Sequence, residues 1–361
     1  MKQHVVAIPS LYGGMSDESR ISTMEGTVMK TKDESVSRRD RAAGFHRNVR
    51  RIWVATVACC VSAGSILVPG AAKAASPIPI TACQSITATG YYQVQNALSS
   101  AGGDCLVIQA SNVTLDLNGY AISGAGTGAG IHVLATAPGT KTGKDDGGEG
   151  KGTKAGTQIK GVFIEGRGAI ISLFATGIED DAIGTFGDYF DVNSNTGDGL
   201  LLKGAQGGHY SALLTDSNGG SGVHVRLGSG NTLVAVDTEG NIAYGVWLDA
   251  SSNNSLDGDI AIGNVISGYY LGCSPNGPNG VSCAHGSSSS NLIFGSLAFH
   301  GFKLPQQYGI AVDLGNTNNR IAENQSTNNT IDMLDKNVSC GTDIWFYNLF
   351  GTANPAASCI N

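Results

Sequence analysis

The fold is decided by a short segment that recurs along the chain: Gly199-Leu200-Leu201-Leu202, Gly222-Val223-His224-Val225, Gly245-Val246-Trp247-Leu248 and Gly268-Tyr269-Tyr270-Leu271. The same pattern starts at Gly177 and Gly309, so the six glycines are 22, 23, 23, 23 and 41 residues apart. Apolar residues alternate with variable ones, which predicts a short strand with one buried face. A fixed period of this length is typical of a solenoid, in which each repeat buries its apolar face against its neighbours.

This repeat also places side chains on one outer face. If the first and third positions after each glycine point inward, the second and fourth face solvent, and successive strands lie about 4.8 Å apart. The outward positions then hold His224, Trp247, Tyr270, Lys203, Arg226 and Asp249. Aromatic rings beside charged groups suit a sugar, so the expected binding residues are His224, Trp247, Asp249 and Tyr270. The alternative is an ordinary surface in which stacked rings and an Arg226–Asp249 ion pair only stabilise the ladder.

The first 74 residues form a leader in this interpretation. Arg50 and Arg51 precede an apolar run over residues 52–68, and Ala72-Lys73-Ala74 follows it. This order is that of a secretory signal peptide cleaved after Ala74. An uncleaved anchor is the alternative, but 17 residues is the lower limit for spanning a bilayer. We therefore expect a secreted, periplasmic or cell-surface protein with no membrane contact after cleavage.

Removal of the leader makes the chain more acidic. The whole chain has 22 basic and 29 acidic residues, and the leader takes 11 and 6 of them, so the mature chain keeps 11 and 23, a net charge of −12. Such a charge repels phosphate backbones, which argues against nucleic acid as a partner. The charge is compatible with neutral sugars or with calcium-bridged anionic ones. We expect no cofactor, with calcium required only under the lyase alternative given below.

Six of the eight cysteines lie beyond the leader. Six cysteines allow fifteen pairings, of which pairing between nearest neighbours is the simplest. That choice gives Cys83–Cys105, Cys273–Cys283 and Cys340–Cys359. No Cys-x-x-Cys occurs among these six and the seven histidines are dispersed, so a zinc site is not expected.

Residues 75–361 are expected to form a single domain with loop insertions near 138–156 and 273–290. Helical periodicity occurs only at Tyr91–Ser100, which as a short helix would cap the N-terminal end of the solenoid. A second strand in each repeat is introduced by an asparagine with an apolar residue two positions later: Asn231/Leu233, Asn254/Leu256, Asn291/Ile293 and Asn319/Ile321. Asparagines stacked at one turn can hydrogen-bond along the column.

These repeats, the segment Ser111–Gly119 and the closing Asn348-Leu349-Phe350-Gly351-Thr352 carry a resemblance. The chain resembles secreted right-handed parallel β-helix proteins of the pectate-lyase-like superfamily over roughly residues 80–361. The resemblance implies an all-β fold, a single-stranded right-handed parallel β-helix with about 22–23 residues per rung. It leaves activity open, because proteins of this fold include lyases, hydrolases and adhesins.

A narrower likeness concerns two neighbouring repeats. The segments 198–203 and 222–228 are similar to the Lys and Arg rungs of the alginate-lyase and chondroitinase B family. This likeness implies a calcium-assisted polysaccharide lyase, with Lys203 as base, Arg226 as acid, and Asp181 or Asp198 near the metal. The chain departs from that family because no acidic Asn-Gly-Glu cluster lies upstream, and one aspartate coordinates calcium poorly.

The sequence thus favours recognition of an extracellular polysaccharide or glycan through one exposed sheet face. Two other functions stay open. One is a polysaccharide lyase that uses Lys203 and Arg226 for β-elimination on a uronate polymer. The other is a structural surface protein or adhesin without catalysis. Whether the protein is an enzyme, which glycan it binds and its oligomeric state are not decided by the residues.

Overall fold

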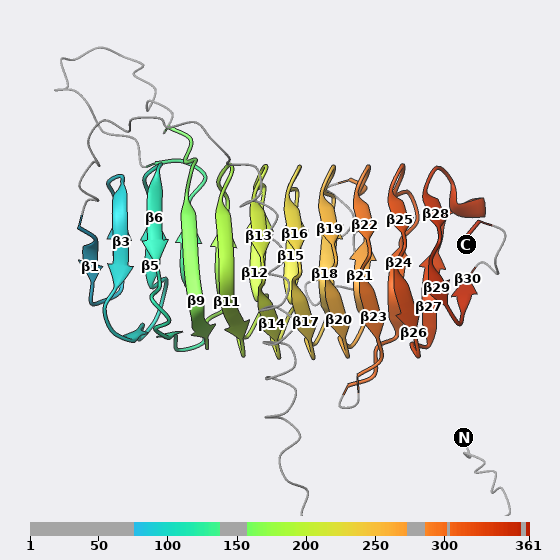
Figure 1. Ribbon diagram of the computed structural model, residues 1–361, viewed down its shortest axis with the longest axis horizontal. Helices are drawn as coiled ribbons and strands as arrows, with labels where there is room; N and C mark the ends of the chain where they lie inside the picture. The colour runs from blue at the N-terminus through green and yellow to red at the C-terminus, as the bar shows by residue number, and fades with distance from the viewer. Residues whose placement is uncertain (1–75, 138–156, 273–285, 302–303, 355–358) are drawn as a thin grey trace, which may run out of the picture. The chain divides into compact units, whose positions relative to one another are not determined.

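The computed structural model describes residues 76–137, 157–272, 286–301, 304–354 and 359–361. These residues form thirty strands, β1–β30, and one 3-10 turn, η2 (Val338–Cys340). Parallel pairing joins each strand to its counterpart one rung away, and successive rungs follow one another in a single row (Figure 1). The chain is a right-handed, single-stranded parallel β-helix, as the sequence predicts.

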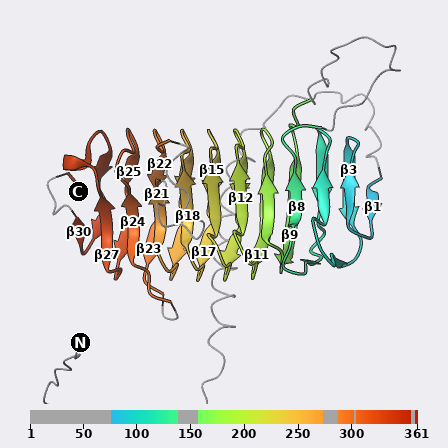
Figure 2. The same ribbon diagram turned by 180° about the vertical axis from the view of Figure 1, so that it is seen from behind.

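The Gly-apolar segments form an eleven-stranded sheet at the back of Figure 1, seen from the other side in Figure 2. We call it the glycine sheet. Its strands in spatial order are β2 (Gln84–Ile86), β5 (Leu106–Ile108), β8 (Ala129–Val133), β10 (Thr176–Asp180), β12 (Leu200–Lys203), β15 (Val223–Arg226), β18 (Tyr244–Asp249), β21 (Ser267–Leu271), β24 (Tyr308–Val312), β27 (Ile331–Asp335) and β30 (Ala353–Asn354).

The other two strands of each rung belong to a nineteen-stranded sheet, because the long strands β9 (Phe163–Ser172) and β11 (Phe186–Asn193) run through both of its ladders. The first ladder also holds β1 (Ile78–Ile80), β3 (Gly90–Val94), β6 (Val113–Asp116), β13 (His209–Ser211), β16 (Thr232–Val234), β19 (Ser255–Asp257), β22 (Leu292–Phe294), β25 (Arg320–Ala322) and β28 (Ile344–Phe346). The second also holds β4 (Leu98–Ser99), β7 (Ile122–Ser123), β14 (Leu214–Asp216), β17 (Asp237–Glu239), β20 (Ile260–Ile262), β23 (Leu297–Phe299), β26 (Gln325–Thr327) and β29 (Leu349–Phe350).

The strand register confirms the period read from the sequence. Leu200 pairs with Ile178 on one side and Val223 on the other, and the same column continues through Val246 and Tyr269 to Ile310. These residues are the first after each glycine, and their side chains are fully or almost fully buried. The third positions are buried as well. The interior of the solenoid is therefore one continuous core, as predicted.

Close packing explains why a glycine stands at or next to the start of these strands. A Cβ on Gly177, Gly199, Gly222 or Gly245 would come within 2.5–2.9 Å of the carbonyl oxygen of the equivalent glycine in the next rung. The same Cβ would lie 2.8–2.9 Å from the side-chain amide nitrogen of an asparagine in one of the turns between strands. Real Cβ atoms do not approach other atoms so closely, and a tightly packed interior has no room to shift.

Those asparagines form a ladder of their own. Asn195, Asn218, Asn241 and Asn264 are buried, and each Nδ2 donates to the Oδ1 of the next at 2.9–3.0 Å. Each of them precedes its glycine by four residues, a spacing that the sequence itself contains. The expected column at the second strand is confirmed separately, since Asn231, Asn254, Asn291 and Asn319 bond in the same way and end at Asp343.

The N-terminal end differs from expectation. Tyr91–Ser100 does not form a capping helix, because its residues lie in β3 and β4. Tyr92 and Val94 alternate with more exposed neighbours and are buried, a period of two that fits a strand. Parallel pairing with β1 and β6 provides hydrogen-bond partners for the backbone N–H and C=O groups of β3.

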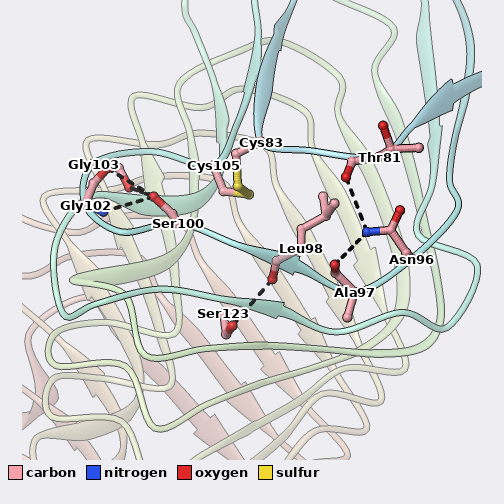
Figure 3. The surroundings of a disulfide bond; sticks show 10 residues. All are labelled: Thr81, Cys83, Asn96, Ala97, Leu98, Ser100, Gly102, Gly103, Cys105 and Ser123. Atoms are coloured by element: carbon pink, nitrogen blue, oxygen red, sulfur yellow. Dashed lines mark hydrogen bonds between the residues drawn. A yellow bond between two sulfur atoms is a disulfide. The ribbon is translucent and has the colours of Figure 1, made fainter.

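Two of the three predicted disulfides are present. Cys83–Cys105 links the segments leading into β2 and β5, beside the turn that holds Ser100, as Figure 3 shows. Cys340–Cys359 closes the C-terminal end. The predicted Cys273–Cys283 pair, the leader and the insertion at 138–156 lie outside the described residues, as does most of the insertion at 273–290.

Candidate functional site

The outer face of the glycine sheet brings the predicted aromatic residues into one column. His224, Trp247 and Tyr270 pair across β15, β18 and β21. The His224 and Trp247 rings stack at 4.0 Å with an interplanar angle of 7°. The sequence does not predict the role of Tyr244. Its ring lies 5.1 Å from the Trp247 ring and 4.7 Å from the Tyr270 ring. The predicted register is therefore confirmed, with one more ring in the stack.

The expectation that this column is open to solvent is wrong for most of it. His224, Asp249 and Tyr270 are each only 6–7% exposed, and Trp247 is partly exposed. Side chains outside the solenoid form a second apolar cluster here: Ala243, Tyr244, Tyr270, Ala311 and Leu334, with Trp247, Ile266, Tyr308 and Ile331 against it. Tyr244 and Tyr308, which precede Gly245 and Gly309, thus pack on the face that the repeat alone would leave open.

The polar edges of these rings bond within the protein. The Trp247 indole N–H donates to the Gly272 carbonyl at 2.6 Å, and the Tyr270 hydroxyl donates to Asp313 at 2.7 Å. Asp313 also accepts from Lys336 at 2.9 Å. A ligand at this end of the column would compete with these contacts, whereas the Lys203 side chain on β12 is 51% exposed.

His224 lies between two carboxylates. Its Nδ1 is 2.8 Å from Asp198 and its Nε2 is 3.6 Å from Asp249. Burial acts to lower the pKa of His224, but hydrogen bonding and charge from Asp198 and Asp249 outweigh it and hold the pKa above its ordinary value. Asp198 also accepts the Ser221 amide, so both of its oxygens are used. This occupancy weakens Asp198 as the metal ligand considered from the sequence.

Lys203 and Arg226 are neighbours on β12 and β15, as predicted. Their side chains are 51% and 36% exposed, more than the aromatic column beside them. The Lys203 ammonium lies 2.9 Å from Glu179, and Arg226 Nε lies 3.9 Å from Asp249. The hydrogen bond that Lys203 donates to Glu179 raises the pKa of Lys203, which keeps its amine protonated at neutral pH. A protonated amine suits binding of a carboxylate better than removal of a proton.

Asp181, expected near a metal in a lyase site with Lys203 and Arg226, belongs to a group of side chains around His132. It lies beside His132 of β8, with Nε2 and Oδ2 3.9 Å apart, and His132 Nδ1 is 2.9 Å from Asp104. Interaction with Asp181 chiefly, and with Asp104, raises the pKa of His132 to about 9 against the effect of burial. His132, Glu179 and Asp181 each offer a ligand atom within 4.8 Å of the others, in the part of the chain that the structure describes.

A further aromatic ladder lies on the other sheet and was missed by the sequence argument. Phe163, Phe186 and His209 pair across β9, β11 and β13, and their rings stack at 4.7 and 4.9 Å. All three side chains are partly exposed or exposed. Phe163 and Phe186 lie outside the Asn-x-apolar pattern that marks this strand in later rungs, so the sequence gives no register for them.

No protein-family model and no curated protein matches the sequence. Among solved structures, the A-modules of the Azotobacter vinelandii mannuronan C-5 epimerases AlgE4 and AlgE6 are similar, with TM-scores of 0.47 and 0.48 and 13% and 12% identity. The match to AlgE4 covers 72% of this chain and 62% of that module, and the match to AlgE6 covers 74% and 86%. Paenibacillus sp. str. FPU-7 alginate lyase matches with a TM-score of 0.38, 12% identity, and coverage of 73% and 92%. These likenesses concern the fold alone.

No helix within the described residues has the length and apolar character needed to span a membrane.

Proposed function

We propose that this chain is an exported glycan-binding protein that recognises an acidic polysaccharide on the outer face of the glycine sheet. The observation that carries the proposal is the pairing of Lys203 and Arg226 on adjacent strands, with both side chains reaching solvent. Two cations one strand apart suit successive carboxylates of a uronate chain. Export is supported by the two disulfides, which persist in oxidising compartments.

Trp247 extends this surface. Its partly exposed ring is held by its indole hydrogen bond and by the stack with His224, and it lies on β18, the strand that pairs with β15, which carries Arg226. A rigid ring next to cations offers an apolar surface for sugar C–H groups while the cations contact the charged substituents. Tyr270, His224 and Asp249 then serve to position Trp247 and Arg226, because they are buried.

The binding test is retention on immobilised alginate, pectate and hyaluronan at low salt. Lys203→Ala with Arg226→Ala, and Trp247→Ala alone, should each weaken retention at least about tenfold, equivalent to about 1.4 kcal/mol. Arg320→Ala and Phe186→Ala, on the other sheet, provide a matched cation and a matched aromatic control. Loss of retention in Phe186→Ala with Trp247→Ala unchanged would move the glycan to the Phe163–Phe186–His209 ladder and contradict the proposal.

A calcium-assisted lyase is the second candidate, favoured by the same Lys203–Arg226 register. The raised pKa of Lys203 opposes its role as the base, so this mechanism needs substrate binding to separate Lys203 from Glu179. Elimination produces an unsaturated sugar that absorbs ultraviolet light. Calcium-dependent absorbance that disappears in Lys203→Ala would establish the lyase; binding without any absorbance change would leave recognition as the function. Absence of both would favour the structural role.

A further inference from the structure

One arrangement of side chains occurs twice on the glycine sheet. In the first copy, Asp104 holds His132 Nδ1 at 2.9 Å and also accepts the Ala129 amide at 2.8 Å, while Nε2 faces Asp181 at 3.9 Å. The second copy consists of Asp198, His224 and Asp249, where the first aspartate likewise accepts a backbone amide. The chain thus builds an Asp–His–Asp unit at β8–β10 and again at β15–β18.

The two copies differ in the residue that pairs with the histidine on the next strand. His224 pairs with Trp247, whose ring covers the imidazole at 4.0 Å. His132 pairs with Glu179, which places a third potential ligand, a carboxylate, beside the imidazole and Asp181. The second copy therefore serves as an internal reference, because it has an equivalent histidine and two equivalent aspartates but no third potential metal ligand at the position of Glu179.

The surroundings of His132 are compatible with a role as a metal ligand. Asp104 can accept a hydrogen bond from Nδ1–H, so that loss of the second ring proton leaves a lone pair on Nε2, on the side of Asp181; metal-bound histidines are oriented by carboxylates in this way. Nε2 is buried and has no hydrogen-bond partner among the described residues. Its distance of 3.9 Å from Asp181 is too long for a hydrogen bond but suits two ligands of one ion with bonds of about 2.0–2.2 Å.

We propose that His132 Nε2 and the carboxylates of Glu179 and Asp181 bind a first-row divalent transition ion, with Asp104 as the residue that orients His132. One imidazole nitrogen with two carboxylates favours such an ion over calcium, which prefers six to eight oxygen ligands. Lys203 opposes binding, because its ammonium occupies one oxygen of Glu179 at 2.9 Å. The site does not depend on the proposed glycan function.

The test is calorimetric titration of the tag-free full chain with ZnCl2 at about pH 8.5, since a metal must displace protons from its ligands. We expect one Zn²⁺ per chain, retained in excess CaCl2, and ligand-field absorbance when Co²⁺ is used instead. Glu179→Gln and His132→Gln should weaken binding at least about tenfold, and Asp104→Asn about 10–100-fold. His224→Gln, the same change in the reference copy, should bind Zn²⁺ as the wild type does.

Lys203→Gln gives a prediction of opposite sign. Removal of its ammonium frees Glu179 and should tighten Zn²⁺ binding severalfold, an effect that a loss of folding cannot imitate. The proposal is overturned if the wild type binds no Zn²⁺, if Glu179→Gln binds it unchanged, or if His224→Gln loses it. Weaker binding in Lys203→Gln would also contradict it.

Discussion

The Lys203 ammonium donates to a Glu179 carboxylate at 2.9 Å, across the neighbouring strands β12 and β10. This contact connects the proposed glycan surface with the proposed metal site, because Glu179 competes with any carboxylate that approaches Lys203. The pair is largely exposed on the lysine side, so its own contribution to stability is small. The contact matters because it competes with the binding of a glycan carboxylate by Lys203 and with the binding of a metal ion by Glu179.

Replacement of Glu179 by glutamine should therefore raise affinity for an acidic polysaccharide. The change removes one negative charge next to Lys203 and frees its ammonium, and we expect binding to tighten about two- to fivefold at low salt, an effect that salt screens. Affinity is measured by calorimetry in excess chelator, so that metal binding does not contribute. The control is Glu239→Gln on β17, an exposed glutamate of the other sheet. Equal affinity of wild type and Glu179→Gln would contradict a role for Lys203 in carboxylate binding.

The strand register was predictable because it depends on a pattern that every rung repeats. Ile178, Leu200 and Val223 occupy equivalent positions whatever their neighbours are, so the spacing of glycines gives their pairing directly. Burial on the outer face was not predictable in this way. His224 is covered by Trp247 from the next rung, and Trp247 in turn contacts Tyr244, which lies outside the repeated segment.

The His132 group was missed for a different reason. His132 pairs with Glu179 although the two are 47 residues apart, because the insertion at 138–156 separates their rungs. The Gly130-Ile131-His132-Val133 segment fits the repeat, but the spacing that aligns it with Gly177 is not 22 or 23. Asp181 was therefore considered as a metal ligand without the histidine that lies beside it.

Protonation of His224 should make stability depend on pH. Its pKa is raised in the folded state by Asp198 and Asp249, with Arg226 also facing Asp249. Stability from this group is complete below the unfolded pKa of about 6.5 and is lost as pH rises through the folded value. His224→Gln should cost about 3–5 kcal/mol near pH 6, because two largely buried carboxylates lose their cation.

The measurement is the melting temperature of both proteins from about pH 5 to 10. The difference between wild type and His224→Gln should be largest at low pH and shrink above about pH 6.5. His209→Gln, which removes a partly exposed imidazole from the other sheet, tests for effects of losing any histidine. A difference that stays constant across this range would show that His224 does not change its charge on folding.

The repeated glycines, such as Gly245, should not tolerate replacement by alanine. In Gly245→Ala the new Cβ would lie 2.5 Å from the Gly268 carbonyl oxygen and 2.8 Å from Asn264 Nδ2. We expect destabilisation of about 1–3 kcal/mol or more, because the ladder cannot move apart without breaking its hydrogen bonds. Denaturant unfolding measures the change. Gly102→Ala is the control, since its Cβ would have no neighbour closer than 3.6 Å. Equal stability of the two variants would contradict this explanation of the repeat.

Asp343 ends the second asparagine ladder as a carboxylate rather than an amide. Burial raises its pKa to about 6, against the effect of hydrogen bonds from Asn319. A raised folded pKa means that the stability this group contributes is complete below an unfolded pKa of about 3.9 and is lost as pH rises to about 6. Asp343→Asn keeps the acceptor for Asn319 and removes the buried charge, so it should unfold at a higher temperature than the wild type above about pH 6.

The advantage of Asp343→Asn should disappear near pH 4, where the wild-type carboxyl is protonated in the folded state. Asn337 donates to Asp343 at 3.1 Å and would lose that contact, but the same amide also donates to Asp335 at 3.0 Å. The cost of the substitution is thus small and independent of pH, whereas its benefit appears only as pH rises. Melting curves at intervals between about pH 4 and 8 separate the two contributions. A variant less stable than the wild type at pH 8 would show that the charge on Asp343 does not destabilise the folded state.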